Sequence, residues 1–250
     1  MSKIAIIPIK GTIVSERSRA PGMKTTSSLD IVPLLAEIRK SKAIKALVLE
    51  INSPGGTPFS CEEIAQAIKS VNKPTVAWIR EVAASGGYWI ATAADSIVAG
   101  TLSTVGSVGV ISIRPNVSEL LEKIGVDIDA VASGVHKMLG LPFKPLSPEE
   151  KQEDRQRREE EIRIIQQSFI REIQGKRQLR EDVIKEISSG KTYLGQEAKD
   201  LGLVDELGGR EKAFEIAASK AKITKYKVAD FTKRLERPKR GLLSRLFLPW

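Results

Sequence analysis

The sequence predicts an α/β fold with a mainly parallel sheet. Two continuous apolar runs, at 44–51 and 74–80, are typical of strands covered on both faces. They alternate with segments whose apolar residues recur every three or four positions, the spacing of an amphipathic helix. This order of strand and helix indicates parallel strands joined by right-handed crossovers.

The first elements follow from local patterns. Residues 3–9 resemble a first strand that ends in a turn, whereas 15–28 is polar and predicts a loop. A helix is expected next, capped by Ser27 or Ser28, with four apolar residues at helical spacing: Ile31, Leu34, Leu35 and Ile38. The stretch SPGGTPFSCEEIAQAIKS (53–70) then predicts a glycine turn followed by a second helix.

Three more strands are expected over DSIVAG (95–100), SVGVIS (107–112) and VDIDAVAS (126–133), with a helix near 117–124. A long charged helix is expected over 149–174. Ser147 and Glu150 match a capping box at its start, and Pro148 takes the first helical position. Shorter helices follow at 179–190 and twice within 194–221.

We therefore expect three parts. An α/β core covers 1–146, a helical region over 147–225 completes the same domain, and a basic, apolar tail covers 226–250. The end of the tail combines apolar and basic residues: Leu242, Leu243, Leu246, Phe247, Leu248 and Trp250 beside Lys239, Arg240 and Arg245. That pattern suits an amphipathic anchor on an anionic membrane surface, and equally a disordered tail or an oligomer contact.

Composition narrows the function classes. The formal net charge is +9, but basic residues concentrate after position 150 without interleaved aromatic residues, so no nucleic-acid partner is expected. One cysteine, Cys61, excludes an intrachain disulfide. One histidine, His136, leaves no cysteine–histidine metal cluster, and a Ser-His-Asp triad would have to use it.

The sequence shows neither a signal peptide nor an apolar run of the roughly 18 residues that a membrane span needs. We expect a cytoplasmic or peripheral membrane protein. If an anchor preceding the first strand has been removed, the expectation becomes a membrane-anchored protein.

Ser85 lies where a buried strand turns into an alanine-rich helix. Open α/β sheets usually place their sites at this edge, and amide N–H groups at a helix start have no intrahelical partner. Gly86 and the glycines of INSPGG (51–56) offer donors for an oxyanion. On pattern alone, the alternative is that these glycines only permit close packing of helix on strand.

A nucleophilic serine needs a base, and with a single histidine a neutral lysine is the physical alternative. Its pKa, ordinarily near ~10.4, must be lowered by desolvation or by hydrogen bonds to the neutral amine. Composition does not choose among the many lysines.

INSPGG, ASGGYWIATAAD, TVGSVGV and ASGVHK, in this order, resemble the signal peptide peptidase A family of serine peptidases over roughly residues 1 to 220. SPGG alone also suits the Clp protease subunit and the wider crotonase-like fold. The resemblance implies that fold, a repeated ββα superhelix with a helical C-terminal extension. Family members usually carry a membrane anchor before the first strand, and the present chain departs from them there.

By resemblance, Ser85 is the nucleophile and Lys137, 52 residues later, is the general base. Gly86 and Gly56 would supply the oxyanion donors. The Ser107 hydroxyl would hydrogen-bond the lysine amine, which keeps the amine neutral and directed at Ser85. The pair would meet within one chain or between neighbouring protomers of a ring-like homo-oligomer. Hydrophobic signal peptides or other extended peptides are the implied substrates, and no cofactor is implied.

Other assignments stay open. A stomatin-processing peptidase would use the same pair, although its relatives space serine and lysine differently. A catalytically silent crotonase-fold scaffold and an acyl-CoA enzyme are alternatives of other classes. Cys61 and His136 are interpreted as structural. Five residues could line specificity pockets but are individually more typical of core: Ala83, Ala84, Tyr88, Trp89 and Ile111.

Overall fold

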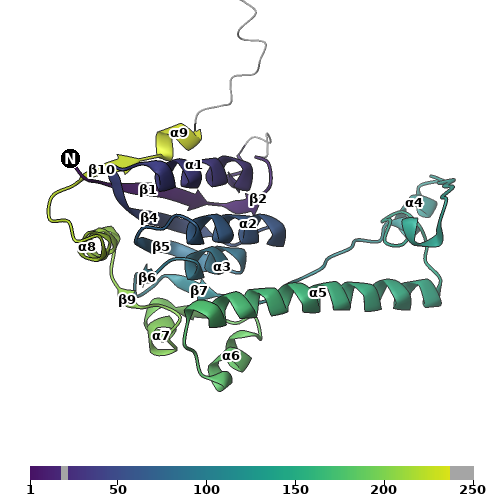
Figure 1. Ribbon diagram of the computed structural model, residues 1–250. Helices are drawn as coiled ribbons and strands as arrows, with labels where there is room; N and C mark the ends of the chain where they lie inside the picture. Colours follow the sequence, from purple (N-terminus) through teal and green to yellow (C-terminus); the bar gives the residue numbers. More distant parts are fainter. Residues whose placement is uncertain (18–21, 237–250) are drawn as a thin grey trace, which may run out of the picture. The chain divides into compact units, whose positions relative to one another are not determined.

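The computed structural model describes residues 1–17 and 22–236 (Figure 1). The apolar and basic side chains of the predicted tail beyond residue 236 lie outside this range. Contacts divide the chain into two compact units, a core unit of Met1–Val108 and Ile170–Trp250 and a second unit of Gly109–Phe169. The predicted boundary at residue 146 stays a prediction.

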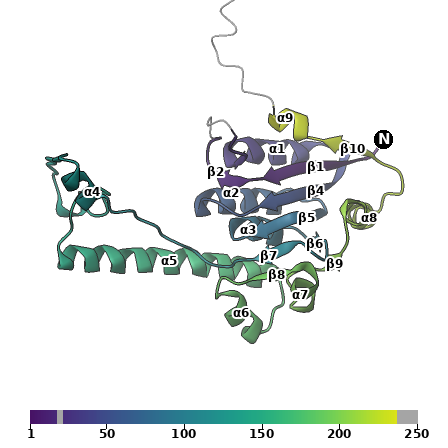
Figure 2. The same ribbon diagram turned by 180° about the vertical axis from the view of Figure 1, so that it is seen from behind.

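The core unit is built on an eight-stranded sheet with the order β10-β1-β4-β5-β6-β9; β7 pairs with β5, and β8 with β7 (Figure 2). Every pairing is parallel except β7 with β8, which confirms the predicted α/β class. The strands are β1 (Lys3–Lys10), β4 (Ile44–Ser53), β5 (Thr75–Ala84), β6 (Ser96–Ala99), β7 (Thr104–Gly106), β8 (Thr192–Leu194), β9 (Glu206–Leu207) and β10 (Lys227–Asp230).

Successive side chains of each strand point to opposite faces of the sheet. One face packs on α8 (Arg210–Lys220) through small and branched residues: Ile4, Ile6, Ala46, Val48, Val76 and Val98. Beside the strands, α1 (Ser28–Lys40), α2 (Pro58–Lys69) and α3 (Gly86–Thr92) pack against one another in sequence. Three shorter helices complete the core unit: α6 (Glu181–Ile187), α7 (Gly195–Asp200) and α9 (Thr232–Glu236).

The predicted loop over 15–28 contains a strand. β2 (Thr12–Val14) and β3 (Thr25–Ser27) form a small parallel sheet. Ser27 occupies the N-cap position of α1, but its hydroxyl donates to the carbonyl oxygen of Ser15 at 2.7 Å instead of capping the helix.

Two predicted strands, 107–112 and 126–133, are wrong. The strand in this part of the chain is β7, and it ends at Gly106, where the predicted strand would begin. Gly106 and Ser107 both have positive φ angles, 114° and 53°. This turn takes the chain out of the sheet. The apolar residues beyond it are exposed, with Ile111 at 82% and Val131 at 95%, because no neighbouring strand covers them.

The second unit contains α4 (Ser118–Lys123), the one-turn helix η1 (Val135–Lys137) and most of α5 (Pro148–Lys176). The capping box is confirmed: the Glu150 amide donates to the Ser147 hydroxyl, and the Ser147 amide donates to the Glu150 carboxylate. Asp154, 3% exposed, binds the guanidinium groups of Arg114 and Arg158. Within the described ranges, no helix combines the length and apolarity required to cross a bilayer.

Candidate active site

Ser85 occupies a single-residue turn between β5 and α3, with φ 52° and ψ −125°. Its amide donates to the carbonyl oxygen of Gly106 at 2.8 Å. Its own carbonyl accepts from the amides of Tyr88 and Trp89. The backbone is therefore held on both sides in a conformation that costs a residue with a β-carbon free energy. Ser85 directly follows the carboxyl end of β5, and its side chain is half-buried.

The SPGG turn lies directly against Ser85. The Ser53 hydroxyl donates to the Gly11 carbonyl at 2.6 Å and accepts from the Gly55 amide at 3.1 Å, which fixes the turn. Gly55 has φ 106°, and a β-carbon there would lie 3.0 Å from Cβ of Ser85 and 2.8 Å from the nitrogen of Gly86. Only glycine fits this approach. Ser53 belongs to the INSPGG motif, but the motif alone does not indicate this role.

The amides of Gly56 and Gly86 lie side by side. Ile13 bridges to this turn through the Gly55 carbonyl and the Thr57 amide, so the Gly56 amide points away from Ile13. A β-carbon on Gly86 would lie 3.3 Å from the Gly56 nitrogen. Among the described residues neither amide has a hydrogen-bond acceptor. Two free donors next to a serine are the arrangement that stabilises an oxyanion.

Cys61 packs behind this pair of donors. A β-carbon on Gly86 would lie 2.2 Å from Sγ of Cys61, so the thiol defines how closely α3 approaches α2. The side chain is fully buried, and burial raises the pKa of the thiol to about 12. The thiol is therefore protonated at neutral pH and acts as a packing group, in line with its interpretation as structural.

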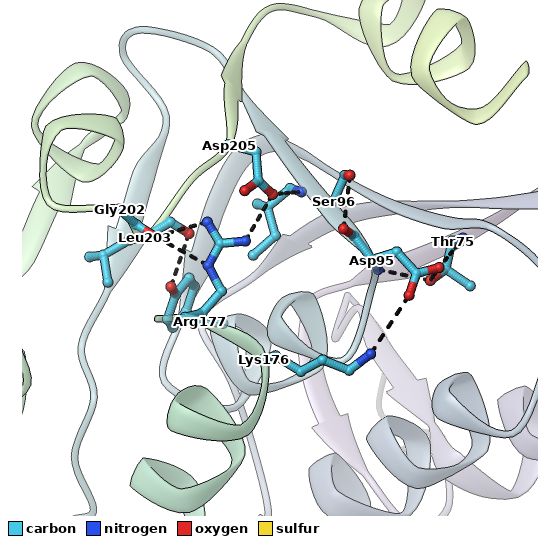
Figure 3. Close-up of polar contacts among 10 residues, drawn as sticks. Thr75, Asp95, Ser96, Lys176, Arg177, Gly202, Leu203 and Asp205 are labelled. Carbon is cyan, nitrogen blue, oxygen red and sulfur yellow. Dashed lines mark hydrogen bonds and ion pairs between the residues drawn. The ribbon is translucent and has the colours of Figure 1, made fainter. Parts of the chain in front are cut away.

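A polar network anchors α3 from behind. The buried Tyr88 hydroxyl donates to the Leu203 carbonyl at 3.0 Å. Arg177, just after α5, donates to the Gly202 carbonyl and to Asp205, as Figure 3 shows. The same figure shows Lys176 beside Asp95, whose carboxylate accepts from Thr75 at the start of β5. These hydrogen bonds and ion pairs therefore fix the positions of helix α3 and the end of α5.

The residues predicted for the site fall into two groups, four in the core unit and Lys137 in the second unit. Ser85, Gly86 and Gly56 come together, and Ser107 follows the carbonyl that accepts the Ser85 amide. Ser107 has φ 53°, and its own amide donates to the Lys191 carbonyl at 2.8 Å.

Lys137 belongs to the second unit. It ends η1, its amide donates to the Gly134 carbonyl at 3.1 Å, and its side chain is exposed. The neighbouring His136 lies 3.4 Å from Glu153.

The pocket-lining candidates are mainly core. Ala83, Tyr88 and Trp89 are buried, Ala84 is half-buried, and Ile111 is exposed. Ile111 is therefore not a core residue, in contrast to the expectation.

The fold and the serine turn are those of the class of proteins with the Clp protease fold. A Clp protease family model matches residues 12–100. A mutant of the 1510-N membrane-bound stomatin-specific protease has a similar fold, with a TM-score of 0.56 and 13% identity over 92% of this chain and 97% of that one.

Within this class, a model of peptidase family S49 matches residues 67–224, and the chain belongs to this family. Serine protease SPPA of Arabidopsis thaliana is 35% identical over 88% of this chain, and Protease 4 of Haemophilus influenzae is 30% identical over 85%. The chain spans only about a third of these two relatives, 33% and 34%. It spans 77% of the protease-like protein slr0021 of Synechocystis sp., at 33% identity.

Proposed function

We propose that the protein is a serine endopeptidase in which Ser85 is the nucleophile and Lys137 the general base. The observation that carries this proposal is the strained turn of Ser85 beside the two free amides of Gly56 and Gly86. Family S49 membership and the protease names of the relatives support it.

The proposed chemistry uses this chain's own groups. A neutral Lys137 amine takes the Ser85 proton as the hydroxyl oxygen attacks a peptide carbonyl. The amides of Gly56 and Gly86 bind the negative oxygen of the tetrahedral intermediate. The lysine then donates the proton to the leaving amine, and the acyl-enzyme is hydrolysed by water that the lysine activates. Ser107 is proposed to hydrogen-bond the amine and keep it directed at Ser85.

A fluorophosphonate probe tests the proposal, because it reacts only with an activated serine. We expect labelling of the wild type and none of Ser85→Ala or Lys137→Met. Lys123→Met is the matched control, since Lys123 is also an exposed lysine of the second unit. Folded protein without labelling would instead support the silent scaffold, and binding of coenzyme A would support the acyl-CoA alternative.

We propose that a second copy of the chain is a partner. Between residues 111 and 131 the second unit exposes seven large apolar side chains: Ile111, Ile113, Leu120, Ile124, Val126, Ile128 and Val131. Light scattering should show an oligomer, and Leu120→Asp with Val131→Asp should reduce its mass. Mixing Ser85→Ala with Lys137→Met then asks where the pair forms: restored labelling means that the lysine comes from a neighbouring chain.

The proposed substrates are hydrophobic or unfolded peptides, including signal peptides, as the resemblance implies. A stomatin-type substrate is the second candidate, favoured by the likeness in fold to the stomatin-specific protease. Cleavage of a signal peptide and of a stomatin C-terminal peptide at equal concentration would separate the two.

A further inference from the structure

A cationic hollow lies at the amino edge of the core sheet. Its volume is about 530 Å³, and it is walled by the connections after α1 and α2 and by the end of α8. Pro74 on its wall precedes β5 and Ser85 follows it, so the ten residues of β5, about 30 Å, separate the two sites. The lining contains seven basic residues and no acidic one: Arg39, Lys40, Lys42, Lys45, Lys73, Lys220 and Lys222.

Most of these positive charges have no acidic partner among the described residues. Lys73 donates to the carbonyl oxygens of Ile38 and Ser41, at 2.5 and 2.6 Å, and so caps the carboxyl end of α1. The other six make no ion pair with any residue in the ranges that the structure describes. Burial lowers the pKa of Lys73, and the ammonium group of Lys45 lowers it further, as expected where positive charges are not neutralised.

Helix ends account for only part of this charge. Carboxyl ends of helices carry about half a negative charge each, and cations near them are stabilising. Helices α1 and α8 end in the lining of this hollow and offset roughly one positive charge, whereas α2 ends at Lys69, before the lining resumes at Asn72. Six cations without an acidic partner exceed that amount, and their mutual repulsion in one hollow favours a bound anion.

We propose that the hollow binds a ligand that carries several phosphate groups. Lysine ammonium groups are compact point charges suited to phosphate oxygens. Ser41 and Asn72 in the lining add neutral hydrogen-bonding groups, and the volume suits a small ligand. Within the part of the chain that the structure describes, the lining contains no aromatic residue to stack a base, which argues against nucleic acid. The phosphates belong either to a soluble polyphosphate or to the headgroups of an anionic lipid surface.

Calorimetry with inorganic tripolyphosphate tests the site. We expect saturable binding to the wild type that weakens as salt is added. Replacing Lys42, Lys45 and Lys220 together by glutamine should weaken binding about 100-fold, at roughly fivefold per lysine. The matched control replaces three exposed lysines outside the hollow, Lys123, Lys151 and Lys185, by glutamine. This control variant has the same net charge as the hollow variant, and it should bind tripolyphosphate like the wild type.

Vesicles distinguish the two sources. Lipid headgroups would be identified as the ligand if the protein co-sediments with phosphatidylglycerol vesicles but not with phosphatidylcholine vesicles. Tripolyphosphate should then reverse this co-sedimentation. Tripolyphosphate binding without vesicle binding would identify a soluble anion. Absence of tripolyphosphate binding, or equal loss in both triple variants, would overturn the proposal. If the hollow variant does not fold, as judged by circular dichroism, K42Q alone should still weaken binding about fivefold.

Discussion

The amide of Ser85 donates to the carbonyl oxygen of Gly106 at 2.8 Å, and this bond joins two motifs that lie far apart in the sequence. It holds the turn after β5 against the end of β7, the strand that leads into Ser107. Because both Ser85 and Ser107 have positive φ angles, the two serines sit on turns of restricted geometry. A small change in either turn is therefore expected to displace the proposed nucleophile.

Strain at Ser85 predicts opposite effects on stability and activity. Ser85→Gly should raise the free energy of unfolding by about 1 kcal/mol relative to Ser85→Ala, since glycine accepts φ 52° without steric cost. Both variants lack the hydroxyl, so neither should be labelled. Chemical denaturation of the two variants measures the difference. Equal stability would mean that the turn stores no strain.

Gly86 should not tolerate a side chain, although its backbone angles would. Gly86→Ala places a methyl group 2.2 Å from Sγ of Cys61 and 3.3 Å from the Gly56 nitrogen, so α3 must move. We expect fluorophosphonate labelling to slow at least tenfold, because the Gly86 amide is displaced; complete loss of an oxyanion donor costs roughly 100- to 1,000-fold. Adding Cys61→Ala removes the sulfur and should recover part of the rate. A double variant as slow as Gly86→Ala would show that the thiol is not the obstacle.

Local sequence patterns were sufficient to predict those helices and strands that depend only on neighbouring residues. The apolar runs of β4 and β5 and the capping box of α5 were predicted because neighbouring residues alone specify them. The strands expected at 107–112 and 126–133 failed because apolar alternation does not reveal whether a pairing strand is present.

The same limit applies to the candidate site. The motifs pointed to Ser85, Gly86 and Gly56, which the structure brings together. The bond from Ser85 to Gly106 and the packing of Cys61 behind Gly86 join residues distant in sequence, and no local spacing encodes them. The meeting of Ser85 with Lys137 stays a prediction.

Asp154 should stabilise the second unit selectively. It is buried and accepts hydrogen bonds from Arg114 and Arg158, so Asp154→Ala leaves these two guanidinium groups without their carboxylate. Arg157, 3.9 Å from Asp154, keeps its pair with Glu161. A cost of about 2 kcal/mol is expected, below the usual range for buried pairs because both arginines are partly exposed.

Hydrogen exchange should therefore quicken within 109–169 and stay unchanged in β4 and β5. Asp182→Ala, which breaks the exposed pair with Arg180, is the control and should alter neither region. Uniform loss of protection across the whole chain would contradict a local role for Asp154.

The buried thiol of Cys61 predicts a loss of stability at alkaline pH. Burial raises its pKa from 9.0 to about 12, so the folded protein keeps a proton that the unfolded chain releases above pH 9. A group with a raised folded pKa contributes stability that is fully present below its unfolded pKa and is lost as pH rises towards the folded value.

The free energy of unfolding should consequently fall between pH 9 and 12 by up to about 1.4 kcal/mol per pH unit from this group. Tyr88, whose pKa burial also raises, adds a similar loss above pH 10. Comparing the wild type with Cys61→Ala isolates the thiol, because all other titrating groups are common to both. Their stability difference should shrink by about 1 kcal/mol from pH 8.5 to pH 10. A difference that stays constant with pH would mean that the thiol titrates alike in the folded and unfolded chains, and that water reaches the space behind Gly86.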